Sequence, residues 1–211
     1  MAVSLAYEVS GPRNGDPIPP VVVLLGSLGS DLSMWDPQAT ALSDEFRVIA
    51  VDQRGHGRSP SPAGPYSIRG LSEDVLAILD TLAVDAAHII GLSMGGAIAQ
   101  WLAANASHRV LSLSLLCTAA KFGEPQGWIE RAAAARADGT ESLADAVVAR
   151  WFTEDLATRD PEFVRRYREM VAATPDEGYA ACCDALADWD FAADLPRIAA
   201  PRITPKSFFS P

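Results

Sequence analysis

The stretch His-Ile-Ile-Gly-Leu-Ser-Met-Gly-Gly-Ala, residues 88–97, decides the fold that this sequence predicts. Its β-branched residues Ile89 and Ile90 are typical of a buried strand, and small residues with helix formers follow the motif. The pattern Gly-x-Ser-x-Gly between a strand and a helix is typical of a sharp turn that exposes its serine. A side chain at either glycine of that turn would collide with neighbouring backbone. Ser93 is therefore a candidate nucleophile, although a glycine-rich turn without any chemistry fits the same residues.

Strands alternate with helical segments on both sides of this turn. Apolar runs predict strands at residues 2–9 (half of an opening hairpin), 21–25, 46–51, 88–90 and 110–116. Helical spacing of apolar residues predicts helices at about 35–44, 71–82 and 95–105. This alternation predicts an α/β fold, in which helices cover both faces of a mostly parallel sheet.

From about residue 125 to residue 188 the sequence contains only helical patterns. We expect about four helices there, forming a lid over the carboxyl ends of the strands, where ligands bind in such folds. A helical layer that only completes the core is the alternative. The predicted division is a core over 1–122, a helical lid over 123–195, and a returning core segment with an atypical tail over 196–211.

Composition narrows the possible partners and compartment. A chain of 211 residues is most simply one domain, and a net charge of −10 argues against nucleic acid or an anionic membrane as the main partner. The sequence has neither a signal peptide nor an apolar run long enough to span a bilayer. Its three cysteines, Cys117, Cys182 and Cys183, form neither a disulfide framework nor a metal motif, so we expect reduced, buried thiols. These features favour a soluble, cytoplasmic protein.

Several longer stretches resemble one family, the α/β-hydrolases, and within it the 3-oxoadipate enol-lactonases. They are Ser27-Leu-Gly-Ser-Asp-Leu-Ser-Met-Trp-Asp-Pro-Gln38, Asp52-Gln-Arg-Gly-His-Gly-Arg-Ser-Pro60, Gly91-Leu-Ser-Met-Gly-Gly96, Leu115-Leu-Cys-Thr-Ala-Ala-Lys-Phe-Gly123, Arg150-Trp-Phe-Thr153 and Gly178-Tyr-Ala-Ala-Cys-Cys183. The resemblance implies an enzyme of bacterial aromatic breakdown that opens an enol-lactone ring in the β-ketoadipate route. It implies a small lactone or ester as substrate and no metal or organic cofactor.

The resemblance also assigns roles to residues. Ser93 would attack the lactone carbonyl, and the backbone N–H groups of Leu28 and Met94 would stabilise the oxyanion. Lys121, and Arg131 or another arginine of the lid, are candidates to contact a substrate carboxylate, with solvated surface charges as the alternative.

The partners that a serine nucleophile needs are missing from the expected places. In this fold the acid and then the histidine follow the serine along the chain. After Ser93 the only histidine is His108, at the far end of the following helix, while His56 belongs to a structural loop and His88 begins a strand. We therefore expect a chain cut short, without the triad acid, the histidine and the last two strands. Ser93 would then react slowly, and residues 110–116 would form an exposed sheet edge.

Other functions remain compatible with the sequence. A perhydrolase or a carbon–carbon bond hydrolase uses the same scaffold, and a hydrolase-fold protein that binds ligand without turnover suits a chain lacking the histidine. Ser93 excludes the aspartate nucleophile of dehalogenases. The glycine spacing fits neither dinucleotide-binding nor P-loop motifs.

Overall fold

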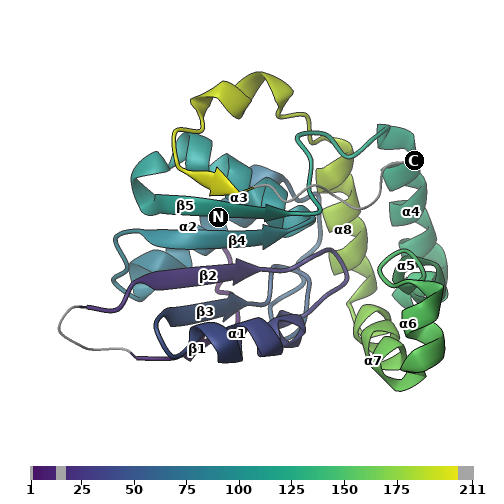
Figure 1. Ribbon diagram of the computed structural model, residues 1–211. Coiled ribbons are helices and arrows are strands. Elements are labelled where there is room, and N and C mark those ends of the chain that lie inside the picture. The colour runs from purple at the N-terminus through teal and green to yellow at the C-terminus, as the bar shows by residue number, and fades with distance from the viewer. Residues whose placement is uncertain (1, 13–17, 204–211) are drawn as a thin grey trace.

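The computed structural model describes residues 2–12 and 18–203. In this part the chain forms a sheet of six strands in the order β1-β3-β2-β4-β5-β6 (Figure 1). The first strand is antiparallel to its neighbour and all others run parallel. The strands are β1 Tyr7–Ser10, β2 Val21–Leu25, β3 Arg47–Val51, β4 Ala87–Leu92, β5 Val110–Leu116 and β6 Arg202–Ile203. The predicted α/β fold is confirmed.

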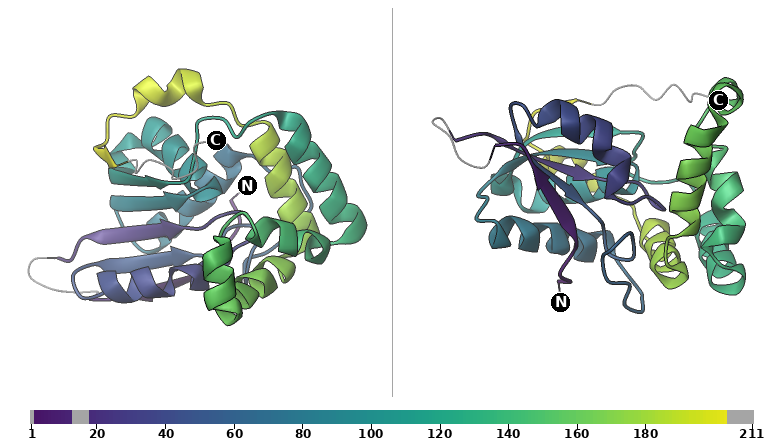
Figure 2. Two further views of the ribbon diagram at one scale, coloured as in Figure 1. Left: turned by 45° about the vertical axis from the view of Figure 1, so that its right-hand side comes forward. Right: turned by 90° about the horizontal axis from the view of Figure 1, so that it is seen from below.

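Helices cover both faces of this sheet because successive strand residues point to opposite sides. On one face Val22, Leu24 and Val48 pack with the helices η1 (Leu32–Trp35) and α1 (Asp36–Leu42). On the other face Val23 and Ile49 pack with α2 (Ile68–Thr81) and α3 (Met94–Asn105). Figure 2 shows the two sets of helices on either side of the sheet. Burial on both faces explains why the central strands are continuous apolar runs.

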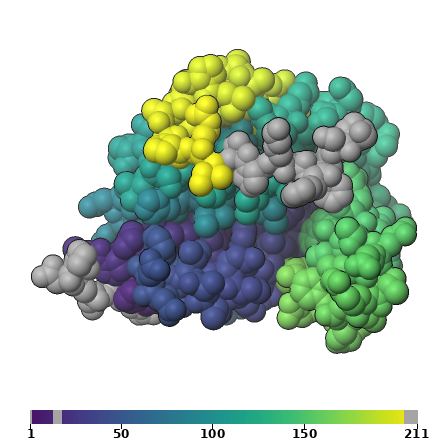
Figure 3. Space-filling model, viewed as in Figure 1, coloured from purple at the N-terminus to yellow at the C-terminus, as the bar shows by residue number. Residues whose placement is uncertain are grey.

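A helical layer stands at the carboxyl ends of the parallel strands (Figure 1). Over the described residues it contains five α-helices where we expected about four: α4 Pro125–Asp138, α5 Ala144–Val148, α6 Glu154–Arg159, α7 Pro161–Ala172 and α8 Asp176–Ala187, with the short η3 Thr140–Leu143 between α4 and α5. Helix α8 packs into the main core, whereas α5 and α7 share a small core of their own. The segment that contains α5 to α7, green in the space-filling view, projects beside the sheet (Figure 3).

Two expectations for the sheet's borders were wrong. Residues 2–9 do not pair with the next strand in a hairpin, since β1 pairs with β3 instead. Strand β5 is not an edge along its whole length, because β6 pairs with Leu113 and Ser114. Pro201 precedes β6 and its carbonyl accepts a hydrogen bond from Leu113, so its missing N–H costs nothing in the ladder. Most of the predicted atypical tail, residues 204–211, lies outside the described residues.

None of the described helices combines the length and apolar character that crossing a membrane requires.

Candidate active site

Ser93 lies on the predicted turn, between β4 and α3. Its backbone has φ 54° and ψ −114°, a conformation that costs an L-residue energy and persists only where the surroundings hold it. The surroundings do so, because the Ser93 N–H donates to the Leu116 carbonyl at 2.9 Å. The Thr118 hydroxyl also donates to the Ser93 carbonyl at 2.7 Å. The side chain is half-buried, and its hydroxyl makes no hydrogen bond with any described residue.

The two glycines of the motif are required by close backbone approach. A Cβ on Gly91 would lie 2.4 Å from the Gly95 carbonyl oxygen, and one on Gly95 would lie 2.2 Å from the Leu25 carbonyl oxygen. Real Cβ atoms do not approach so closely. The steric reason for the spacing that the sequence suggested is therefore present in the structure.

The loop after β2, residues 26–31, lies beside this turn. Two of its amides are committed: the Gly29 N–H donates to His56 Nε2 at 2.9 Å and the Ser30 N–H to the Ser27 carbonyl at 3.2 Å. Neither the amide of Leu28 nor that of Met94, the first residue of α3, has an acceptor among the described residues. Two N–H groups near Ser93 thus remain available, and one of them belongs to the positive end of a helix.

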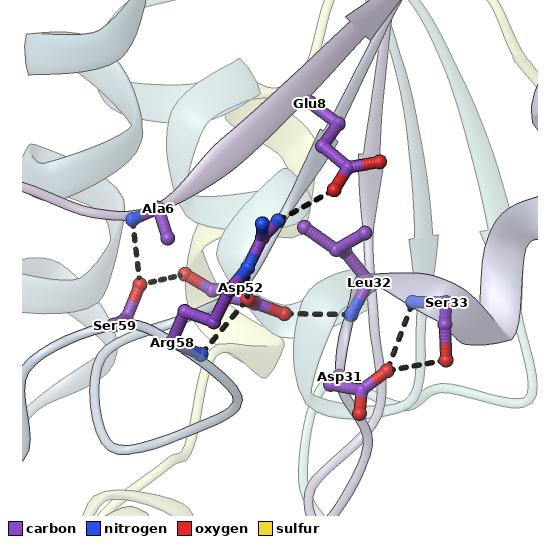
Figure 4. A network of polar contacts seen from close by, with 8 residues as sticks. All are labelled: Ala6, Glu8, Asp31, Leu32, Ser33, Asp52, Arg58 and Ser59. Atoms are coloured by element: carbon purple, nitrogen blue, oxygen red, sulfur yellow. Dashed lines mark hydrogen bonds and ion pairs between the residues drawn. The ribbon is translucent and has the colours of Figure 1, made fainter.

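A polar network around Asp52 fixes this loop to its neighbours (Figure 4). The buried carboxylate of Asp52 accepts from the Leu32 N–H at 2.7 Å and from the Arg58 N–H at 3.0 Å. The Arg58 guanidinium reaches on to Glu8 at 2.7 Å, and the Ser59 hydroxyl donates to the Asp52 carbonyl at 2.6 Å. The loop after β2 and the loop after β3 are therefore held as one unit.

His56 belongs to that unit and is fully buried. Burial lowers the pKa of its imidazole to about 4, although the Arg54 carbonyl beside Nδ1 partly opposes this effect. The ring is therefore neutral near pH 7, with Nδ1–H facing Arg54 and Nε2 accepting from Gly29. This bond pattern fits the structural-loop role expected for His56.

A cavity of about 550 Å³ opens over Ser93, within the size range of small-molecule sites. The turn and the loop after β2 form its floor, with Ser27, Leu28 and Ser93 in the lining. The helical layer forms an aromatic wall, made of Trp128, Trp151, Phe152, Tyr167 and Tyr179, with Phe122 from the preceding loop. The floor comes from the sheet and the wall from residues far along the chain.

The charged side chains of this lining are both cationic. Arg131 on α4 and Arg150 after α5 lie in the wall, and neither pairs with a carboxylate of residues 2–12 or 18–203. Arg131 stacks over the Trp128 ring, with its guanidinium carbon 5.0 Å from the ring centre. An unpaired cation in an apolar cavity favours an anionic ligand.

The other predicted residues lie elsewhere. Lys121 forms an exposed ion pair with Asp190 at 3.1 Å and is not part of the lining, which agrees with the alternative of a surface charge. The Nδ1 atom of His88 lies 2.7 Å from the Ser112 hydroxyl oxygen, and His108 lies in the short η2 (Ser107–Arg109) beyond the end of α3. None of the three histidines in the sequence contacts Ser93.

The cysteines differ from expectation at one position. Cys182 and Cys183 are buried, and burial raises the pKa of the Cys183 thiol to about 12. Cys117 is exposed and lines the cavity, because it follows β5 at the carboxyl edge of the sheet with φ 44°. Within the described residues, groups of three or more His, Cys, Asp or Glu that could hold a metal ion are absent.

Comparisons with known proteins agree with this arrangement. The model of the alpha/beta hydrolase fold family matches residues 19–190. The chain belongs to the α/β-hydrolase family. The hydrolase is 42% identical to "3-oxoadipate enol-lactonase 2" of Acinetobacter baylyi over 199 residues, which cover 94% of this chain and 73% of that relative. It is 36% identical to "3-oxoadipate enol-lactonase 1" of the same organism over 95% of this chain and 73% of the relative.

A solved structure shows the same relationship. The enol-lactonase from Burkholderia xenovorans LB400 superposes on the hydrolase with a TM-score of 0.93 at 44% identity, covering 97% of this chain and 79% of that one. Because these relatives act on ester bonds, the hydrolase is by family a carboxylic ester hydrolase.

Sequence reasoning gave Trp35 and Tyr179 no role in the cavity, although both line it. Both stand in stretches that already resembled this branch of the family, as does Arg150, and the Trp35 ring lies close to Gly26. Helical spacing alone explained Tyr179 as core, so only the structure shows that it lines the cavity.

Proposed function

We propose that this hydrolase cleaves ester and lactone bonds with Ser93 as nucleophile and the amides of Leu28 and Met94 as oxyanion donors. The observation that carries the proposal is the position of Ser93, on a turn held at φ 54° and facing a cavity whose floor also contains Leu28. An oxyanion forming beside Ser93 would meet two N–H groups that no described residue occupies. Removing one such donor costs roughly 3–4 kcal/mol of transition-state stabilisation in other serine hydrolases.

The substrate class that fits the cavity is a small lactone bearing a carboxylate. Arg131 and Arg150 supply positive charge in the wall, and the aromatic side chains suit a carbon ring. The relatives are named 3-oxoadipate enol-lactonases, so we propose 3-oxoadipate enol-lactone, within aromatic catabolism, as the substrate. Residues 123–195 would then serve as the lid that contributes the substrate-binding side chains.

Within residues 2–12 and 18–203 the structure places a serine and two free amides together but no base beside them. His56 and His88 hydrogen-bond elsewhere, His108 lies beyond the end of α3, and the described lining holds neither Asp nor Glu. A serine hydroxyl is a poor nucleophile without a base. We therefore propose slow turnover for this 211-residue chain. The same observation favours the second candidate function, ligand binding without turnover.

A serine-directed fluorophosphonate tests the proposal. We expect slow labelling of Ser93, found by peptide mass spectrometry, that added imidazole accelerates by replacing the base. Ser93→Ala should abolish the label, while Ser27→Ala, which alters another serine of the lining, should leave it unchanged. Labelling that persists in Ser93→Ala would contradict the nucleophile, and rapid labelling without imidazole would contradict the missing base. Labelling accompanied by hydrolysis of an enol-lactone decides against the second candidate function.

A further inference from the structure

Two buried donors of the cavity lining have no partner. Trp35 Nε1 and Tyr179 Oη belong to residues that are 3% and 0% exposed, and neither makes a hydrogen bond with a described residue. Both residues line the cavity above Ser93. A buried polar group without a partner destabilises the folded state, so such groups are rare outside functional sites. A polar ligand in this cavity would satisfy them.

Tyr179 is held firmly beside the loop that carries Leu28. A Cβ at Gly29 would lie 3.2 Å from Tyr179 Cε2, so the ring packs against this loop. The preceding residue, Gly178, approaches the backbone of Gly55 so closely that a Cβ would lie 2.4 Å from the Gly55 carbonyl oxygen. The start of α8 is therefore fixed against the loop after β3, and the phenol cannot turn away without moving that helix.

The surroundings keep the Tyr179 hydroxyl protonated. Burial raises the pKa of this hydroxyl to about 12, and the Cys183 thiol adds to the rise, while the nearby Arg131 opposes it. At neutral pH the group is an O–H donor. Arg131, on the helix packed against α8, supplies a cation close to this donor.

We propose that the Tyr179 hydroxyl donates a hydrogen bond to the substrate carboxylate that Arg131 neutralises. A carboxylate has about four acceptor positions and a guanidinium fills only two of them, so an acceptor position remains for the phenol. Tyr179 is then a binding residue that selects acids over neutral esters. The inference rests on the proposed function in one respect, namely that the substrate occupies this cavity.

Titration with adipate, a six-carbon dicarboxylate, tests the inference without turnover. Binding is followed by the fluorescence of the cavity tryptophans, for wild type, Tyr179→Phe and Tyr167→Phe, with dimethyl adipate as the neutral probe. Tyr167→Phe is the matched control, because Tyr167 lies in the same wall. Its hydroxyl, unlike that of Tyr179, is not among the buried polar atoms that lack a partner. We expect Tyr179→Phe to bind adipate on the order of tenfold more weakly, with dimethyl adipate unaffected. The unfolding free energy of the empty variant should equal or exceed that of wild type, because a buried unpartnered group is removed.

Equal adipate affinity in wild type and Tyr179→Phe would overturn the inference, as would a wild type that does not bind adipate. Should Tyr179→Phe prove less stable, the comparison is repeated in an Arg131→Gln background. A shared carboxylate requires that the Tyr179→Phe effect shrink there, and an unchanged effect would overturn the inference. Fluorophosphonate labelling separates the two proposals. If Ser93 is labelled but wild type and Tyr179→Phe bind adipate equally, only the proposed role of Tyr179 is wrong. If Ser93 is not labelled even with imidazole, the proposed function is wrong.

Discussion

Acidification should destabilise this hydrolase through His56 before most carboxylates titrate. The imidazole has a pKa of about 4 in the folded protein and about 6.5 when unfolded. Because the folded pKa is the lower one, this contribution is fully present above pH 6.5 and is lost as the pH falls toward 4. The difference corresponds to a loss of about 2 kcal/mol at pH 5 and about 3 kcal/mol at pH 4. Protonation also ends the bond that Nε2 accepts from the Gly29 N–H, beside the proposed oxyanion donor.

The assay is urea unfolding at pH 7.5, 6, 5 and 4.5, with His56→Gln as the control. The control cannot titrate in this range, and its side-chain oxygen can accept from the Gly29 N–H. We expect wild type to lose about 2 kcal/mol more than His56→Gln between pH 7.5 and pH 5. Parallel stability curves for the two proteins would show that the buried imidazole is not the group responsible for the acid destabilisation.

The remaining predictions concern the turn, the cavity and the core. The unfolding free energy of Ser93→Gly should exceed that of Ser93→Ala by roughly 1 kcal/mol in urea titration, because φ 54° strains any residue with a Cβ at this position. Equal stabilities of the two variants would contradict the strain. Gly95→Ala should cost about 3 kcal/mol or more in the same assay, whereas Gly127→Ala, where a Cβ meets nothing within 4 Å, should be neutral or stabilising. Arg131→Gln should weaken adipate binding about tenfold by fluorescence titration, and unchanged affinity would place the carboxylate elsewhere. Asp74→Asn should destabilise the fold by roughly 3–5 kcal/mol, because it removes the buried carboxylate that Arg54 contacts at 2.7 Å, and thermal unfolding would show this as a clear loss in Tm.

The sheet and the turn could be predicted because local chemistry determines them. Continuous apolar runs require burial on both faces, and the glycines around Ser93 are needed because a Cβ at either position would lie within 2.4 Å of a backbone oxygen. The resemblance to the family added Leu28 and Met94, which both follow parallel strands whose carboxyl ends meet at one edge of the sheet. Two residues of the cavity floor, Leu28 and Ser93, were therefore accessible from the sequence.

The wall of the cavity could not be predicted from spacing. Tyr179 and Gly29 are 150 residues apart in the sequence, and only the packing of α8 on the loop after β3 brings them together. The choice between a substrate contact and a surface charge for Lys121 also needed the structure, because its partner Asp190 lies far along the chain. Cys117 was expected to be buried with the other thiols, yet the end of β5 places it at the cavity. Such contacts depend on how the helical layer packs on the sheet, and the periodicity of apolar residues does not predict that packing.

The most direct test of the account is a crystal structure of the phosphonate adduct on Ser93. We expect the phosphoryl oxygen to lie about 2.7–3.1 Å from the amide nitrogens of both Leu28 and Met94. We also expect that no side chain of residues 2–12 or 18–203 other than Ser93 is bonded to phosphorus. An adduct whose oxygen faces away from both amides, or one formed on another serine, would contradict the account.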